Sequence, residues 1–214
     1  GAAVVGSGAV GGTTSSFFRG VNSNQTLLLI DGVRVNDANA VPGALLGGFE
    51  LLPGDRLEVA RGPQSTSFGG AAIGGVIAVG GTNPVGSSLR ADTEAGSFGT
   101  YRGRLSGAGS VGRLSFSAGG SFIDTDNERP NNHYDQRTEQ VRLRLAAGRN
   151  LTVGATFRGL QQRFVSPGDL RTTNTTPEGT TRFDNVLGTV FVEAQPSGRW
   201  SSRLTVGGQD YFLE

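Results

Sequence analysis

The chain has 214 residues, 36 of them Gly, with no Cys, no Met and a single His. Only 17% of the residues are charged and the net charge is +1, so the sequence lacks the basic surface that nucleic-acid binding requires. The absence of Cys excludes disulfides and thiolate metal sites. The single His133 argues against Ser-His-Asp catalysis and His-ligated zinc. We therefore expect no nucleic-acid partner and no enzyme activity.

The first part of the chain, residues 1–85, consists of short apolar runs separated by Gly and Pro. The run at 27–30 predicts a buried strand. Asp31-Gly32 follows, a dipeptide favoured in two-residue hairpin turns because Gly accepts a positive φ, and 33–35 returns as the partner strand. Two further strands are predicted at 56–61 and 75–79. This part of the sequence predicts a small mixed α/β domain.

From residue 86 onward, apolar and polar residues alternate with a period of two, as in strands with two different faces. In the segment 140–147, Val141 and Leu143 lie on one face and Arg142 and Arg144 on the other. A soluble β-sandwich would alternate in the same way. However, arginines recur on the polar face, and an Arg turned toward lipid at the bilayer midplane costs about 2–4 kcal/mol. This cost favours a membrane barrel with the arginines inside.

The connections between these predicted strands alternate in length. Short turns are predicted at 109–112, 148–150 and 196–199, and long polar loops at 124–137 and 164–182. Short turns at one end and long loops at the other are typical of outer-membrane barrels. Counting from Ser88 gives about seven strands, each long enough for the ~9–11 residues of a tilted spanning strand. The predicted fold class is therefore mainly β: a partial transmembrane antiparallel β-barrel preceded by an α/β domain. We expect the natural chain to continue, because an open sheet edge in lipid is costly.

Four blocks in the first part carry a resemblance to a known family. They are Phe-Arg-Gly-Val-Asn at 18–22, Thr-Leu-Leu-Leu-Ile-Asp-Gly-Val-Arg at 26–34, Arg-Leu-Glu-Val-Ala-Arg-Gly-Pro at 56–63, and Ser-Thr-Ser-Phe-Gly-Gly-Ala-Ala-Ile-Gly-Gly-Val-Ile at 65–77. In this order and spacing they resemble the plug domain of TonB-dependent outer-membrane receptors, and most closely that of the cobalamin receptors. The resemblance implies a plug domain over 1–85 and the first part of a β-barrel over 86–214.

The resemblance also implies a function. Such a receptor lies in the bacterial outer membrane, contacts outer-membrane lipid, binds a scarce small molecule and imports it using TonB and its inner-membrane energising complex. The expected ligand is cobalamin or a similar metal chelate. A ferric-siderophore, haem or oligosaccharide receptor is the alternative, as is a receptor-derived surface binding protein that does not transport. The TonB box would lie before Gly1.

Three residues of the first part are candidate contacts between plug and barrel. Arg19 and Arg61 match family arginines that pair with barrel glutamates, a role that suits the two-pronged guanidinium. An ordinary surface arginine is the alternative for each. Glu58 alternates with apolar neighbours in its predicted strand, so it faces either the barrel wall or solvent.

The segment after the Asp31-Gly32 turn is the candidate ligand contact. In the cobalamin-receptor likeness, Asn36, Asp37, Ala38 and Asn39 form an apical loop of the plug that touches the ligand. A solvated loop is the alternative.

One acidic loop is a candidate calcium site. Asp124, Asp126 and Asp135 supply carboxylate oxygens, the ligands that calcium prefers, and the cobalamin receptors hold calcium in the corresponding extracellular loop. The Arg129-Pro130 pair departs from the EF-hand pattern, which needs Gly there, and a solvated acidic loop is the alternative. No other cofactor is expected.

Overall fold

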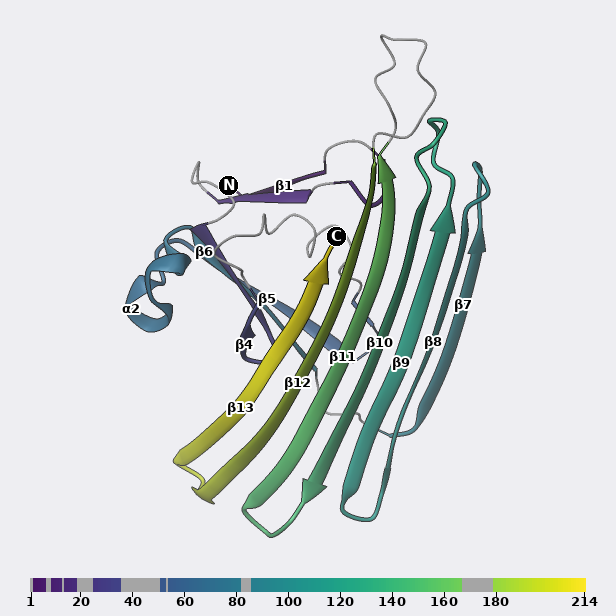
Figure 1. Cartoon of the computed structure of the whole chain (residues 1–214). Coiled ribbons are helices and arrows are strands. Elements are labelled where there is room, and N and C mark those ends of the chain that lie inside the picture. The colour runs from purple at the N-terminus through teal and green to yellow at the C-terminus, as the bar shows by residue number, and fades with distance from the viewer. Residues whose placement is uncertain are drawn as a thin grey trace.

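The computed structural model describes residues 2–6, 9–12, 14–18, 25–35, 51–52, 54–81, 86–166 and 179–214. They form three sheets of two, four and seven strands. Figure 1 shows the seven long strands side by side in chain order, with the smaller sheets lying against one side of them. No helix among the described residues has the length and apolar character needed to cross a membrane.

The seven-stranded sheet, called the wall below, is antiparallel throughout, with each strand paired to its neighbour in the chain. It begins at Ser88, so the predicted start and number of its strands are confirmed. Its strands are β7 (Ser88–Ala95), β8 (Tyr101–Val111), β9 (Leu114–Thr125), β10 (Tyr134–Ala146), β11 (Leu151–Ser166), β12 (Gly179–Ser197) and β13 (Trp200–Leu213).

The connections of the wall follow the predicted short-and-long pattern where the structure describes them. Strands β8 and β9 are joined through 112–113, β10 and β11 through 147–150, and β12 and β13 through 198–199. At the opposite end, 126–133 connect β9 to β10. The loop between β11 and β12 lies largely outside the described residues.

The two faces of the wall differ as the alternation predicted. On β10, Val141 and Leu143 are 42% and 44% exposed, whereas Arg142 between them is 8% exposed. The cross-strand register carries the same division through the sheet, because Leu143 pairs with Phe116 and with Ala155. The face that holds Arg142 is called the inner face below. The exposed apolar side chains of the outer face include Leu105, Leu114, Phe116, Phe122, Val141, Leu143, Leu145, Phe157, Val186, Val190, Val192, Leu204 and Val206.

The four-stranded sheet has the order β4-β3-β6-β5. Strands β3 and β6 are parallel, whereas β4 and β5 pair antiparallel with their neighbours. The predicted hairpin is confirmed, since Asp31 and Gly32 have φ of 49° and 87° between β3 and β4, both positive as a type I′ turn requires. The elements are β3 (Thr26–Ile30), β4 (Val33–Arg34), β5 (Asp55–Arg61), α2 (Ser65–Phe68), η2 (Gly70–Ala72) and β6 (Gly75–Gly81).

The core of this small sheet extends into the wall. Leu28, Ile30, Val35 and Ile77 form one buried cluster with Leu187 of β12, which is 1% exposed. The other face of the sheet packs against η2 through a second cluster of Leu27, Ala72 and Val76. Burial of an apolar side chain of this size stabilises by about 1.5–3 kcal/mol, so packing against Leu187 holds the sheet to the inner face of the wall.

A second contact joins the N-terminal strands to the wall. Strands β1 (Ala2–Gly6) and β2 (Thr14–Phe18) form the two-stranded sheet. Between them, the backbone N–H of Val10 donates to Asn127 Oδ1 at 3.2 Å, and Asn127 Nδ2 donates to the Val10 carbonyl at 3.2 Å. Asn127 belongs to the connection between β9 and β10. These hydrogen bonds join the N-terminal segment to the end of the wall where the longer loops lie.

Candidate functional site

The residues of greatest chemical interest lie where the four-stranded sheet meets the inner face of the wall. Asp31 stands at the tip of the β3–β4 turn and Asp55 at the start of β5, and their side chains are 2% and 1% exposed. Opposite them are Arg142 of β10 and Arg158 of β11, each with a side chain that is 10% exposed. We call these four residues the charge cluster.

Arg158 donates to both aspartates. Its Nε donates to Asp31 Oδ2 at 2.6 Å. Its two terminal nitrogens donate to the Asp55 carboxylate, Nη1 to Oδ2 at 3.0 Å and Nη2 to Oδ1 at 2.6 Å. This fork-to-fork geometry is the strongest form of the Arg–carboxylate pair.

Arg142 completes the cluster from the neighbouring strand. Its Nη2 donates to Asp31 Oδ1, and its Nη1 donates to the backbone carbonyl of Gly81 at 2.6 Å. Backbone groups of the same domain also hold the aspartates, since the Leu52 N–H donates to Asp55 Oδ2 at 3.0 Å and the Gly81 N–H donates to Asp31 Oδ1 at 3.4 Å. Two positive and two negative charges are thus buried together with several hydrogen bonds, which is the condition under which buried charge is tolerated.

A second group of charges lies next to the cluster on the wall itself. Glu193 of β12 accepts from Arg144 Nη2 at 2.8 Å and from Arg203 Nη1 at 2.8 Å. The Arg203 guanidinium also lies over the ring of Phe191, 4.1 Å from its centroid, a favourable cation–π position. These two arginines therefore have their acidic partner within the wall.

A cavity of about 670 Å³ lies between the two groups of charges. Its lining comes from both sheets and includes Asp31, Arg56 and Glu58 on one side and Arg142, Arg144 and Arg203 on the other. Polar side chains line most of this space, so it is suited to charged or hydrated groups.

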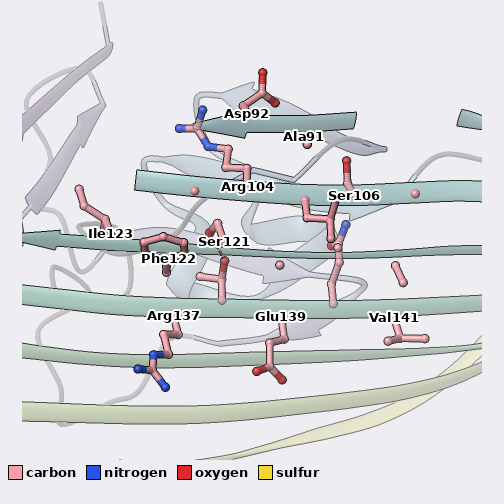
Figure 2. A pocket seen from close by; sticks show the side chains of 18 of the residues that line it. Ala91, Asp92, Arg104, Ser106, Ser121, Phe122, Ile123, Arg137, Glu139 and Val141 are labelled. Carbon is pink, nitrogen blue, oxygen red and sulfur yellow. Dashed lines mark hydrogen bonds between the residues drawn. The ribbon is translucent and has the colours of Figure 1, made fainter. Parts of the chain in front are cut away.

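The outer face of the wall carries a different kind of hollow, a groove of about 1510 Å³ over β7 to β11. Exposed apolar side chains such as Leu105, Phe116 and Phe122 line it, together with Gly103 and Gly120. Figure 2 shows Phe122 and Val141 within this groove and Arg137 and Glu139 near them. Charged side chains, among them Asp124, Asp135, Arg137 and Glu139, line the groove beside these apolar residues.

The predicted contact residues have different outcomes. Arg19 lies outside the described residues. Arg61 is exposed at the end of β5, and within the described part of the chain no ion pair involves it. Glu58 is exposed, pairs with Arg56 at 3.0 Å and lines the cavity beside the wall. Their roles as contacts between plug and barrel stay predictions.

The predicted ligand-contacting loop, Asn36, Asp37, Ala38 and Asn39, lies outside the described residues. Its role also stays a prediction.

The predicted calcium residues converge on a side chain that the calcium hypothesis did not include. His133 Nδ1 lies 3.1 Å from Asp126 Oδ1, and Nε2 lies 3.8 Å from Asp124 Oδ2 and 3.6 Å from Asp135 Oδ1. The imidazole thus stands between the three carboxylates. Within the described ranges, no group of three or more His, Asp and Glu side chains has the arrangement of a metal site. Calcium binding here stays a prediction.

Sequence reasoning missed the charge cluster. It assigned Asp31 to a turn and Arg142 to an inner face, and both assignments are confirmed. It did not connect them, because Arg142 and Asp31 are 111 residues apart. Two sequence features could have indicated the cluster. An apolar strand ends in an acidic turn, and inward-facing arginines recur on neighbouring wall strands.

Comparison with known proteins agrees with this architecture. The family model described as TonB-dependent Receptor Plug Domain matches residues 1–76. That match ends at residue 76, and residues 82–85 lie outside the described residues, so the expected domain boundary at residue 85 stays a prediction. The vitamin B12 transporter BtuB of Vibrio vulnificus (strain YJ016) is 37% identical over 119 residues, which cover 56% of this chain and 19% of that protein.

Two solved structures have the same fold. The ferric yersiniabactin uptake receptor FyuA from Yersinia pestis matches 100% of this chain and 37% of its own, with a TM-score of 0.75 and 18% identity. The pyoverdine outer membrane receptor FpvA from Pseudomonas aeruginosa PAO1 matches 100% of this chain and 34% of its own, with a TM-score of 0.74 and 16% identity. The chain thus spans about a third of these receptors, and about a fifth of the vitamin B12 transporter.

The small sheet bonded to the inner face of a β-wall, the plug-domain match and the receptor relatives agree. Residues 1–76 thus match the plug domain of TonB-dependent receptors, and the chain as a whole is similar to receptors of the bacterial outer membrane, with a plug domain followed by strands of a β-barrel wall.

Proposed function

We propose that this chain is part of an active-transport receptor that binds a scarce nutrient outside the cell and imports it to the periplasm. The single observation that carries the proposal is the charge cluster. It attaches the plug sheet to the inner face of the wall through hydrogen bonds and ion pairs instead of a covalent link. Such an attachment blocks the lumen at rest and can be broken without chemistry, as a gated transporter requires.

The energy for breaking it comes from outside the receptor. Buried ion pairs resist separation because each charge that loses its partner is costly in a site that water does not reach. The outer membrane has no ATP supply, so we infer that TonB and its inner-membrane energising complex pull on the plug. The exposed apolar side chains on the outer face of the wall support its contact with outer-membrane lipid.

For the ligand we propose cobalamin or a similar metal chelate. The relative that is 37% identical over 119 residues is a vitamin B12 transporter, and this similarity supports cobalamin over ferric siderophores. The contacts proposed for the ligand are Asn36, Asp37, Ala38 and Asn39, with calcium bound by Asp124, Asp126 and Asp135.

The test uses the full-length receptor in a bacterium that lacks its own cobalamin receptor and needs cobalamin for growth. Growth that requires both the new receptor and TonB would establish cobalamin transport. Binding of cobalamin to the purified receptor, without any growth, would instead indicate a surface binding protein that does not transport. Should neither occur, cobalamin is the wrong ligand, and ferric siderophores, haem and oligosaccharides are examined by the same two measurements.

Calcium is tested in the same binding measurement. With calcium at the acidic loop, cobalamin binds more weakly after addition of a chelator, and the triple variant D124N/D126N/D135N binds equally weakly with or without calcium. Equal affinity of the unaltered receptor in both conditions would remove calcium from the proposal.

A further inference from the structure

The inner face of the wall has a charge imbalance that the plug compensates. On the inner face of β10 to β13 the charged residues are Arg142, Arg144, Arg158 and Arg203 with one acid, Glu193, a net charge of +3. The acids that offset it, Asp31 and Asp55, belong to the plug. The plug therefore supplies negative charge that the wall lacks.

Two of the four arginines depend on the plug for their partners. The hydrogen bonds and ion pairs that Arg142 and Arg158 make among the described residues go to Asp31, Asp55 and the carbonyl of Gly81, all in the plug. Arg144 and Arg203 differ, because both donate to Glu193 on the wall. Movement of the plug sheet leaves Arg144 and Arg203 paired with Glu193, but it takes the acidic partners of Arg142 and Arg158 away.

An arginine that loses its acidic partner cannot become neutral by losing its proton, since its guanidinium stays charged at any physiological pH. Two adjacent guanidinium groups, already held on rigid strands, then face the lumen with their donors aimed away from the wall. Planar forks of this kind bind carboxylate and phosphate oxygens with two parallel hydrogen bonds. The side chains need no rearrangement, because Arg158 already binds the Asp55 carboxylate in this way and the Asp31 carboxylate accepts one hydrogen bond from each arginine.

We propose that Arg142 and Arg158 form an oxyanion-binding subsite for the transported ligand, occupied at rest by the carboxylates of Asp31 and Asp55. The inference rests on the proposed transport function and adds a chemical requirement to the ligand. The ligand carries an anionic oxygen group, either a phosphodiester, as in a corrinoid, or a carboxylate, as in a ferric polycarboxylate. This group replaces the aspartates when the plug sheet moves. The cavity of about 670 Å³ beside Asp31 and Arg142 provides room for it.

The first experiment tests the subsite without any transport, in the purified full-length receptor. Asp31→Gly removes one carboxylate and keeps the turn, because Gly accepts the φ of 49° found there. Cleavage of the plug by an added protease is followed with potassium acetate or with potassium chloride at equal ionic strength. We expect at least tenfold faster cleavage of D31G in chloride than of the unaltered receptor, and at least threefold protection by acetate. D31G/R142Q/R158Q should show no difference between the two salts.

The matched control is Asp92→Ala, which removes the acid of the exposed Arg90–Asp92 pair on β7; acetate should not alter its cleavage. The subsite is rejected if acetate fails to protect D31G, or if it protects D31G/R142Q/R158Q equally well. Rejection is also the conclusion if D31G is cleaved no faster than the unaltered receptor, because the aspartate is then not holding the arginines.

The second experiment distinguishes the two sources of the oxyanion. Uptake by the full-length receptor is compared for cobalamin, ferric citrate and a ferric trihydroxamate that carries no ionised group. Cobalamin uptake assigns the subsite to a phosphodiester, and ferric citrate uptake to a carboxylate. Uptake of the trihydroxamate alone would overturn the inference while leaving transport intact. Uptake of none of the three would count against the proposed transport, whereas the protease measurement judges the subsite independently.

Discussion

The inner and outer faces of the wall both carry charged residues, but they hold them differently. On the inner face, Arg158 is buried and donates to Asp31 and Asp55, which lie 127 and 103 residues away in the chain. On the outer face, Arg182 is 57% exposed and pairs at 2.9 Å with Asp184, two residues away. The Arg158 pairs join two parts of the molecule, whereas the Arg182–Asp184 pair joins a strand to itself. The buried charges of Arg142 and Arg158 therefore help to hold the plug, and the exposed outer pair does not.

The largest effect is expected from breaking the inner pairs. Arg158→Gln leaves the buried Asp55 carboxylate without its guanidinium, which costs about 3–5 kcal/mol for a buried pair. Hydrogen exchange of the full-length receptor should show strongly reduced protection in β3 and β5, with the wall strands unchanged. Arg90→Gln, at an exposed pair on β7, is the control. Unchanged protection of β5 in R158Q would mean that packing against Leu187 alone holds the plug.

A smaller effect is expected when charge is placed in the apolar part of the outer face. Leu143 is 44% exposed there, and Leu143→Arg should cost about 2–4 kcal/mol if the residue faces the middle of the bilayer. The measurement is the free energy of unfolding of the receptor from lipid vesicles. Glu139→Arg, on the same face of β10 but nearer the long loops, should cost about 0–1 kcal/mol. Equal costs at the two positions would contradict the assignment of this face to lipid.

The smallest effect is expected from the outer ion pair. Arg182→Ala should change the same free energy of unfolding by about 0–1 kcal/mol, because exposed pairs gain little over solvated charges. Its effect should also shrink as salt is added. A loss larger than about 2 kcal/mol would show that the outer ion pair stabilises the receptor more than an exposed pair normally does.

How much of the fold and of the candidate site could be predicted from the sequence depends on how far apart in the chain the interacting residues lie. The Asp31-Gly32 turn and the inward arginine at 142 were predicted because each follows from a local rule, positive φ in a two-residue turn and alternation along a strand. The seven strands beginning at Ser88 were predicted for the same reason.

The charge cluster was not accessible in this way. It depends on which wall strands lie opposite the β3–β4 turn, and no local pattern specifies that. The same limit applies to His133, the only His of the chain. Its carboxylate neighbours could not be predicted from the sequence. It lies between Asp124, Asp126 and Asp135 because both ends of the loop meet at the β9–β10 edge.

The long separation between the partners in the charge cluster also sets an order of assembly. Each wall strand pairs with its neighbour in sequence, and such short-range contacts form early and quickly. The plug comes first in the chain, yet Asp31 and Asp55 have no guanidinium to meet until β10 and β11 are in place. Plug residues, which are synthesised before the wall, are thus among the last to settle. Insertion of the wall into the membrane must therefore leave its inner face in contact with water until the plug sheet has docked.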